Sequence, residues 1–133
     1  MGDGAQGRVL GIGGVFVRAR DPAALAAWYR DHLGIAATCS GEPGPDGSWS
    51  WRQDAGETVF AMFAAGSDYF AADRQVMLNF RVTGLDDLAA RLEAAGIAVE
   101  RRAEWDHPDV GRFARIGDPE GNPIELWEPP AAA

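Results

Sequence analysis

The sequence predicts an α+β fold made of two similar βαβββ modules in tandem. Two segments share one helical pattern: AALAAWYRDHLGIA at residues 23–36 and DLAARLEAAGIA at residues 87–98 each end at a glycine followed by isoleucine. The two glycines, Gly34 and Gly96, are separated by nearly half of the 133-residue chain. A unit of that length is too small to bury a core alone, so two units are expected to pack together and to leave a cleft between them.

Module one is assigned to residues 9–63. Its first strand is predicted from VLGIGGVFVRA, which is rich in β-branched and aromatic residues. A helix follows, because Asp21 suits the N-cap, Pro22 suits the first turn and Gly34 suits the left-handed residue after a helix. Further strands are predicted in SWSWRQ at residues 48–53 and in ETVFAMFA from residue 57.

Module two, residues 76–128, repeats this order after a linker at residues 64–75. VMLNFRV is predicted to be its first strand, and leucines at positions 85, 88 and 92 mark the apolar stripe of its helix. Three more strands are predicted in IAVERR (97–102), GRFARIG (111–117) and NPIELWE (122–128). The DPEGN segment between the last two has the residues of a tight turn.

The composition indicates one globular domain spanning residues 1–133, since 47% of residues are hydrophobic and 24% are charged. A net charge of −8 argues against nucleic acid or an anionic membrane surface as a partner and favours a neutral or cationic ligand. Cys39 is the only cysteine, so an internal disulfide is impossible, and a cytoplasmic location is expected. No apolar run is long enough to span a bilayer.

Two segments carry a family resemblance: GGVFVRARDPAALAAWYRDHLGI and GRFARIGDPEGNPIELWEP. Through them the chain resembles the vicinal oxygen chelate superfamily, which includes glyoxalases, bleomycin-resistance proteins and extradiol dioxygenases. The similarity spans roughly residues 9–129, and DPEGNPIEL is its most specific part. The resemblance implies a single glyoxalase-like domain whose mixed sheets curl around a shared cleft with the helices outside. It also implies a homodimer related by a twofold axis, with the glycines of the first strand near the contact.

Metal-dependent members of the superfamily place their ligands on the first and last strand of each module. The matching positions in this sequence are Gly14, Phe60, Met77 and Glu125. Only Glu125 offers an oxygen, whereas a catalytic divalent metal needs about three protein ligands. We therefore expect neither a bound metal nor another cofactor.

Strand alternation predicts which side chains line the cleft. The predicted lining is aromatic and thioether-rich with a few polar groups: Trp49, Trp51, Phe60, Met62, Met77, Asn79, Phe113, Arg115, Glu125 and Trp127. Such a lining is typical of a site for a small, flat organic molecule. The alternative is that these side chains fill the cavity as ordinary core.

Several roles stay open at this level. Glu125 is either in a structural ion pair with Arg115 or Arg81, or it is a general base or an anchor for a cationic group. Tyr69 either caps the cleft or packs on the other module, and His107 is a lid residue or a solvated loop residue. Two functions follow: a metal-free binding protein similar to the bleomycin-resistance branch, or a lyase, isomerase or dioxygenase that uses Glu125 as base or metal ligand.

Overall fold

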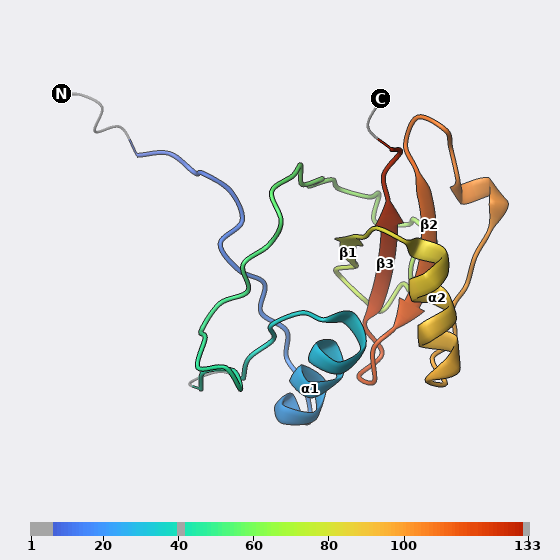
Figure 1. Cartoon of the computed structure of the whole chain (residues 1–133). Helices are drawn as coiled ribbons and strands as arrows, with labels where there is room; N and C mark the ends of the chain where they lie inside the picture. The colour runs from blue at the N-terminus through green and yellow to red at the C-terminus, as the bar shows by residue number, and fades with distance from the viewer. Residues whose placement is uncertain (1–6, 40–41, 132–133) are drawn as a thin grey trace.

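The computed structural model describes residues 7–39 and 42–131 and contains two helices, a 3₁₀ turn and a three-stranded sheet (Figure 1). The elements in chain order are α1 (Pro22–Leu33), β1 (Leu78–Arg81), α2 (Leu85–Ala94), η2 (Ala103–Trp105), β2 (Arg112–Gly117) and β3 (Pro123–Glu128). In the part of the chain that is described, neither helix is long and apolar enough to cross a membrane. The predicted α+β class is confirmed.

Both helix ends of α1 follow from the sequence. The side chain of Asp21 accepts a hydrogen bond from the amide of Ala24 at 3.1 Å and caps the helix, and Pro22 follows in the first turn. Gly34 ends the helix at φ 66°, a left-handed conformation that glycine adopts without steric penalty. The predicted caps are therefore confirmed.

Helix α2 begins at a glycine that has no side chain with which to cap it. Instead, the carboxylate of Glu128 accepts hydrogen bonds from the amides of Gly84 at 2.8 Å and Leu85 at 3.2 Å. This side chain lies at the end of β3, so the last strand satisfies the amides that open α2. The arrangement fixes the helix to the end of the sheet.

The sheet is mixed, with strand order β1-β3-β2. Strand β3 lies in the centre, parallel to β1 and antiparallel to β2. The predicted turn between β2 and β3 is confirmed, because the carboxylate of Asp118 accepts hydrogen bonds from the amides of Glu120 and Asn122. The hydroxyl of Tyr29 donates to the same carboxylate at 2.6 Å and ties α1 to this turn.

The core lies between the helices and one face of the sheet. Its buried apolar side chains come from both helices and from β2 and β3: Leu25, Tyr29, Leu85, Leu88, Leu92, Ala114, Ile116, Ile124 and Leu126. Ala114, Ile116, Ile124 and Leu126 of the sheet belong to this cluster together with side chains of both helices. The side chains of the alternate residues in these strands point to the opposite face of the sheet.

The strands predicted in module one are absent from the described residues. Segments 9–19, 48–53 and 57–63 have no ladder pairing. In module two, segment 97–102 forms one isolated bridge, between Glu100 and Arg115, in place of the predicted strand. The prediction of strands was wrong here for a physical reason: a strand needs a paired neighbour to satisfy its backbone groups, and within residues 7–39 and 42–131 no strand pairs with these segments. The three-stranded sheet does not curl around a cleft, and the tandem arrangement of modules stays a prediction.

Candidate functional site

The face of the sheet opposite the helices carries a polar row across all three strands. Asn79 of β1, Glu125 of β3 and Arg115 of β2 are register partners. Residues in register point to the same side of a sheet, so these three side chains share the face that the helices leave open. The central Glu125 is thus flanked by an amide and a guanidinium group.

Glu125 is a buried carboxylate with partners on both oxygens. The residue is 6% exposed. Its Oε1 accepts a hydrogen bond from Asn79 Nδ2 at 2.9 Å, and its Oε2 accepts one from the Tyr69 hydroxyl at 2.5 Å. Arg115 Nη2 lies 3.8 Å from Oε2, so of the two arginines left open as ion-pair partners of Glu125, Arg115 is the one that lies beside it.

Tyr69 covers the carboxylate from the linker. Burial is the main cause that raises the pKa of Tyr69 to about 12, and the hydrogen bond to Glu125 and the charge of that residue act in the same direction. The hydroxyl therefore remains protonated near neutral pH and acts as a donor. Two roles were left open for Tyr69, and in the structure it caps the Glu125 face.

Arg115 contacts two aromatic rings and has donors without a partner among the described residues. Its guanidinium carbon lies 4.8 Å from the ring centre of Tyr69 and 5.2 Å from that of Trp105, distances suited to cation–π contact. Nη1 donates to the Tyr69 carbonyl at 2.9 Å. Its Nε and Nη2 are buried and have no hydrogen-bond partner among the described residues. A buried donor without a partner is unfavourable, so these groups offer binding capacity to a ligand or water.

A hollow of about 660 Å³ opens beside Arg115. Linker residues form one wall, and η2 with the residues before it forms the other. The lining residues are Gly66, Ser67, Asp68, Tyr69, Phe70, Ala71, Ala72, Glu100, Arg102, Trp105 and Arg115. Its volume falls within the range of small-molecule sites.

An aromatic pair lies next to the polar row on the same sheet face. Phe113 and Trp127 are register partners, and their rings are almost parallel, with an angle of 9° and centres 6.4 Å apart. The indole nitrogen of Trp127 donates to the carbonyl of Val110 at 2.8 Å, which fixes the ring. The face therefore combines charged, amide and flat apolar groups within two successive rows.

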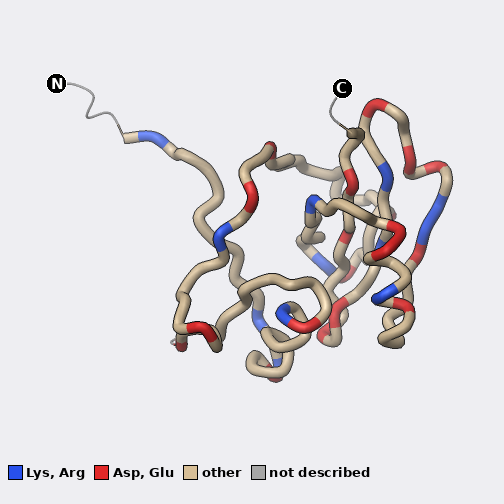
Figure 2. The backbone as a smooth tube through the Cα atoms, in the orientation of Figure 1, with Lys and Arg blue, Asp and Glu red and all other residues tan. Residues whose placement is uncertain are grey.

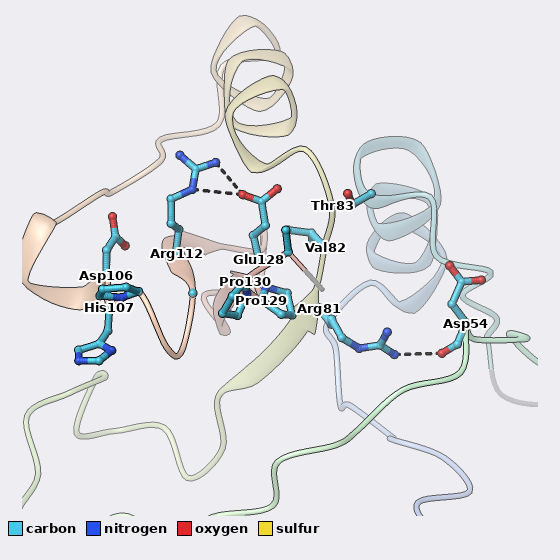
Figure 3. Close-up of a pocket in the computed structure, with 13 residues that line it drawn as sticks. Asp54, Arg81, Val82, Thr83, Asp106, His107, Arg112, Glu128, Pro129 and Pro130 are labelled. Atoms are coloured by element: carbon cyan, nitrogen blue, oxygen red, sulfur yellow. Dashed lines mark hydrogen bonds and ion pairs between the residues drawn. The ribbon is translucent and has the colours of Figure 1, made fainter. Parts of the chain in front are cut away.

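A second hollow, of about 770 Å³, lies at the ends of β1 and β3 (Figure 3). Its charges are engaged in structural contacts. Arg112 pairs with Glu128 at 2.6 Å and with Asp86 at 3.0 Å, and its hydrogen bonds lower the pKa of both carboxyl groups. Glu128 also caps α2. Because these groups already hold the fold together, we place the candidate site at Glu125 instead.

Arg81 and His107, whose roles the sequence left undecided, line the second hollow. Arg81 lines it and donates to the carbonyl oxygens of Asp54 at 2.9 Å and Ala55 at 3.4 Å, rather than to Glu125 (Figure 3). His107 also lines it, and its Nδ1 accepts a hydrogen bond from the amide of Asp109 at 3.1 Å. Neither residue covers the Glu125 face.

The structure separates the predicted lining residues into two groups. Asn79, Phe113, Arg115, Glu125 and Trp127 share one sheet face. The module-one residues are exposed instead: Trp49 63%, Trp51 40%, Phe60 80% and Met62 77%. Met77 is half-buried, directly before β1. A single chain does not bring these five residues onto the Glu125 face, and their role as lining stays a prediction.

Trp105 contributes to the site without having been anticipated from the sequence. It lies in AEWDHPD, a segment without strand or helix periodicity. A large aromatic residue inside an otherwise polar loop is the signal that was available for it, because loops seldom bury such side chains without a partner.

The residues present do not fit a metal held in the superfamily manner. Of the four matching positions, Gly14 and the side chains of Phe60 and Met77 offer no hard donor, and both oxygens of Glu125 already accept hydrogen bonds. Within residues 7–39 and 42–131, no three histidine, cysteine or acidic side chains are grouped as metal ligands.

In comparison with protein families, the chain matches the glyoxalase-like domain over residues 14–127. This match includes most of both predicted modules. The comparison with curated proteins gives no significant match.

Several solved structures are similar to this chain. TnmS3, an antibiotic binding protein from Streptomyces sp. CB03234, is 25% identical, with 85% of this chain and 90% of that chain covered and a TM-score of 0.50. A possible glyoxalase from Bacillus cereus is 18% identical, with 90% and 99% covered and a TM-score of 0.53. Lactoylglutathione lyase from Agrobacterium tumefaciens is 26% identical, with 83% and 87% covered and a TM-score of 0.48.

Proposed function

The chain belongs to the glyoxalase-like domain family of the vicinal oxygen chelate superfamily, and on that premise we propose that it binds a small, flat, neutral or cationic organic molecule. The ligand lies on the sheet face opposite the helices, next to the linker residues that cover Glu125. Binding requires no metal, because one carboxylate is the only oxygen donor at the superfamily's ligand positions.

One observation carries the proposal: the polar row of Asn79, Glu125 and Arg115 directly adjoins the parallel rings of Phe113 and Trp127. The rings offer a stacking surface for a flat molecule, and the polar row offers groups that set its orientation. The likeness to TnmS3 supports a binding role, since that protein is an antibiotic binding protein. The net charge of −8 favours a cationic or neutral ligand over an anion.

Catalysis with Glu125 as a general base is the alternative, and the hydrogen bonds of this residue weigh against it. Both carboxylate oxygens already accept hydrogen bonds, from Tyr69 and Asn79, so neither is free to accept a proton from a substrate. A bound organic cation or a neutral donor would instead benefit from an ionised Glu125. We therefore prefer binding to catalysis.

Three acridine compounds of similar shape and different charge test this proposal: proflavine, which is cationic, acridone, which is neutral, and acridine-9-carboxylate, which is anionic. Trp105 and Trp127 adjoin the site, so quenching of tryptophan fluorescence reports binding. We expect saturable quenching by proflavine and acridone and weaker quenching by the anion.

Variants locate the binding site. Phe113→Ala should weaken proflavine binding about fivefold, since one stacking contact is worth about 1 kcal/mol. Glu125→Gln should weaken it about tenfold, because a contact to a charged group is worth about 1.5 kcal/mol. Glu93→Gln changes an exposed carboxylate on α2 and serves as the control. Equal affinity of all three variants and the wild type would place binding elsewhere and contradict the proposal.

A further inference from the structure

One edge of the Arg115 guanidinium group has no hydrogen-bond partner within residues 7–39 and 42–131. The nitrogens Nε and Nη2 are both buried, and both lack an acceptor there. Their N–H bonds lie side by side on the same edge of the planar group, so they are able to donate together to one ligand group. Because a buried donor without an acceptor is unfavourable, this edge is a candidate contact point for a ligand.

Contacts on the rest of the guanidinium group hold this edge in place. The remaining nitrogen, Nη1, donates to the Tyr69 carbonyl at 2.9 Å. The ring centres of Tyr69 and Trp105 lie 4.8 and 5.2 Å from the guanidinium carbon. Arg115 would lose these contacts if it turned toward another acceptor, so its two donors are preorganised for binding.

The neighbouring carboxylate balances the charge of Arg115 without occupying this edge. Oε2 of Glu125 lies 3.8 Å from Nη2, which is beyond hydrogen-bond distance. The same oxygen already accepts a hydrogen bond from the Tyr69 hydroxyl. Arg115 is therefore compensated in charge and still has two donors to offer.

The charges around this edge favour an uncharged acceptor. A carboxylate or phosphate bound there would lie close to the buried carboxylate of Glu125 and be repelled by it. Acidic and basic residues are interspersed over the strands and the loops beside them, so no surplus of positive charge offsets this repulsion (Figure 2). A carbonyl oxygen is uncharged and has two lone pairs, one for each of the two donors.

The position of Arg115 on β2 relates its donors to the aromatic pair of the sheet face. Phe113 and Arg115 are alternate residues of this strand, so their side chains point to the same face, with about 7 Å between their Cα atoms. A flat molecule that stacks on Phe113 therefore has one edge near Arg115. Arg115 also lines the hollow of about 660 Å³, which leaves room for that edge.

We propose that the ligand is a flat molecule with an uncharged carbonyl oxygen at its edge, as in a ketone, amide or lactone, and that Nε and Nη2 of Arg115 donate to this oxygen. The inference rests on the proposed function and narrows the class of ligand. The rings of Phe113 and Trp127 bind the flat surface, and Arg115 selects molecules that carry the carbonyl group.

The compounds 9-fluorenone and fluorene test this proposal, because both are flat three-ring molecules and only fluorenone has a carbonyl group. Fluorene is the more apolar of the two, so burial alone favours fluorene. Equilibrium dialysis with the protein in excess over the compound measures both affinities. We expect fluorenone to bind about tenfold more tightly, because its oxygen accepts hydrogen bonds from a charged group. Equal affinity, or tighter binding of fluorene, overturns the proposal.

Variants assign the preference to Arg115. Arg115→Lys keeps the positive charge and loses the paired donors, so it should weaken fluorenone binding about tenfold more than fluorene binding. Arg91→Lys makes the same change at an exposed position on α2 and is the control. If the lysine variant does not fold, the double variant Arg115→Met, Glu125→Leu removes the donors without leaving a charge unpaired. A preference for fluorenone that persists in a folded variant without Arg115 contradicts the proposal.

Failure of the proposed function would give a different pattern from failure of this inference. If fluorenone, fluorene and proflavine all fail to bind the wild-type protein, the sheet face is not a binding site and both proposals are wrong. If proflavine and fluorene bind and fluorenone binds no more tightly than fluorene, only the role of Arg115 as the donor to a carbonyl group is wrong.

Discussion

Glu125 and Arg115 form a pair whose members depend on each other. Their side chains are 8% and 14% exposed, so each charge has lost most of its contact with water. At 3.8 Å the pair is loose, and two guanidinium nitrogens of Arg115 lack a hydrogen-bond partner among the described residues. A loose, buried pair contributes little net stability, but removal of one member leaves the other charge uncompensated.

Arg115→Met should therefore lower the free energy of unfolding by about 3 kcal/mol, and the double variant Arg115→Met, Glu125→Leu should recover a large part of that loss. Urea denaturation of both proteins measures the difference. Arg91→Met, which breaks the exposed pair with Asp87, is the control and should change stability by less than about 1 kcal/mol. If the double variant is less stable than Arg115→Met, the two charges are not coupled as we describe.

Tyr69 makes the free energy of unfolding fall as the pH rises in the alkaline range. Its pKa is raised from 10.0 in the unfolded chain to about 12 in the folded protein, mainly by burial. The folded state therefore retains a proton that the unfolded state loses first, so this contribution is complete below about pH 10 and is lost as pH rises to about 12. Tyr29 has a raised pKa as well, by burial and by its bond to Asp118, and adds to the loss above pH 10.

Tyr69→Phe should reduce the slope of unfolding free energy against pH above pH 10 without abolishing it, because Tyr29 remains. Urea denaturation at intervals between pH 8 and 11 measures the slope. Near neutral pH the variant should be less stable by about 1–3 kcal/mol, since Oε2 of the buried Glu125 loses its donor. A slope identical to that of the wild type would show that Tyr69 is not held protonated by the fold.

At the level of elements, the N-cap of α1 is a contact that the sequence alone specifies. Asp21→Ala removes the acceptor for the amide of Ala24 and should destabilise the protein by about 1 kcal/mol. Asp31→Ala removes a carboxylate from an exposed position within the same helix and should have a smaller effect. Thermal melts of both variants measure the difference. Equal melting temperatures would mean that α1 does not contribute to the cooperative core.

Elements with local signals could be predicted, and those that depend on a distant partner could not. The caps of α1, the turn at Asp118 and the facing of β2 and β3 follow from residue chemistry and alternation. Segment 57–63 has an equally good strand pattern, yet it has no ladder, because pairing depends on what lies beside it. A pattern in one segment carries no information about whether its neighbour is present.

The same limit applies to the candidate site. Glu125 and its neighbours Asn79 and Arg115 could be identified, because they lie on strands with clear alternation. Trp105 comes from a short 3₁₀ turn, η2, which has no periodicity from which its direction could be inferred. The position of Phe60 relative to Glu125 depends on whether module one forms a sheet, and this depends on contacts between segments far apart in the sequence.

For the molecule as a whole, the exposed apolar area and the net charge of −8 have opposite effects on the association of two copies. Like charge on two copies opposes association. Burial of the exposed apolar segments 9–19 and 57–63 favours it by about 25 cal/mol for each Å² of apolar surface removed from water. The chain exposes 9854 Å², about 3,000 Å² more than a compact monomer of 14.2 kDa, so we expect burial to be the larger effect. Stability should therefore depend on protein concentration.

The melting temperature should rise by about 2–3 °C for each tenfold increase in protein concentration, as expected when folding and dimer formation are coupled. Phe60→Ala decides whether segment 57–63 is the surface that becomes covered. In one chain its side chain is 80% exposed, and truncation there would change stability little. In a dimer that covers this segment the ring is packed, so the loss should be about 3 kcal/mol. Val110→Ala, at an exposed site outside both segments, should have almost no effect. A melting temperature independent of concentration, together with an unaffected Phe60→Ala variant, would mean that the exposed segments stay in solvent.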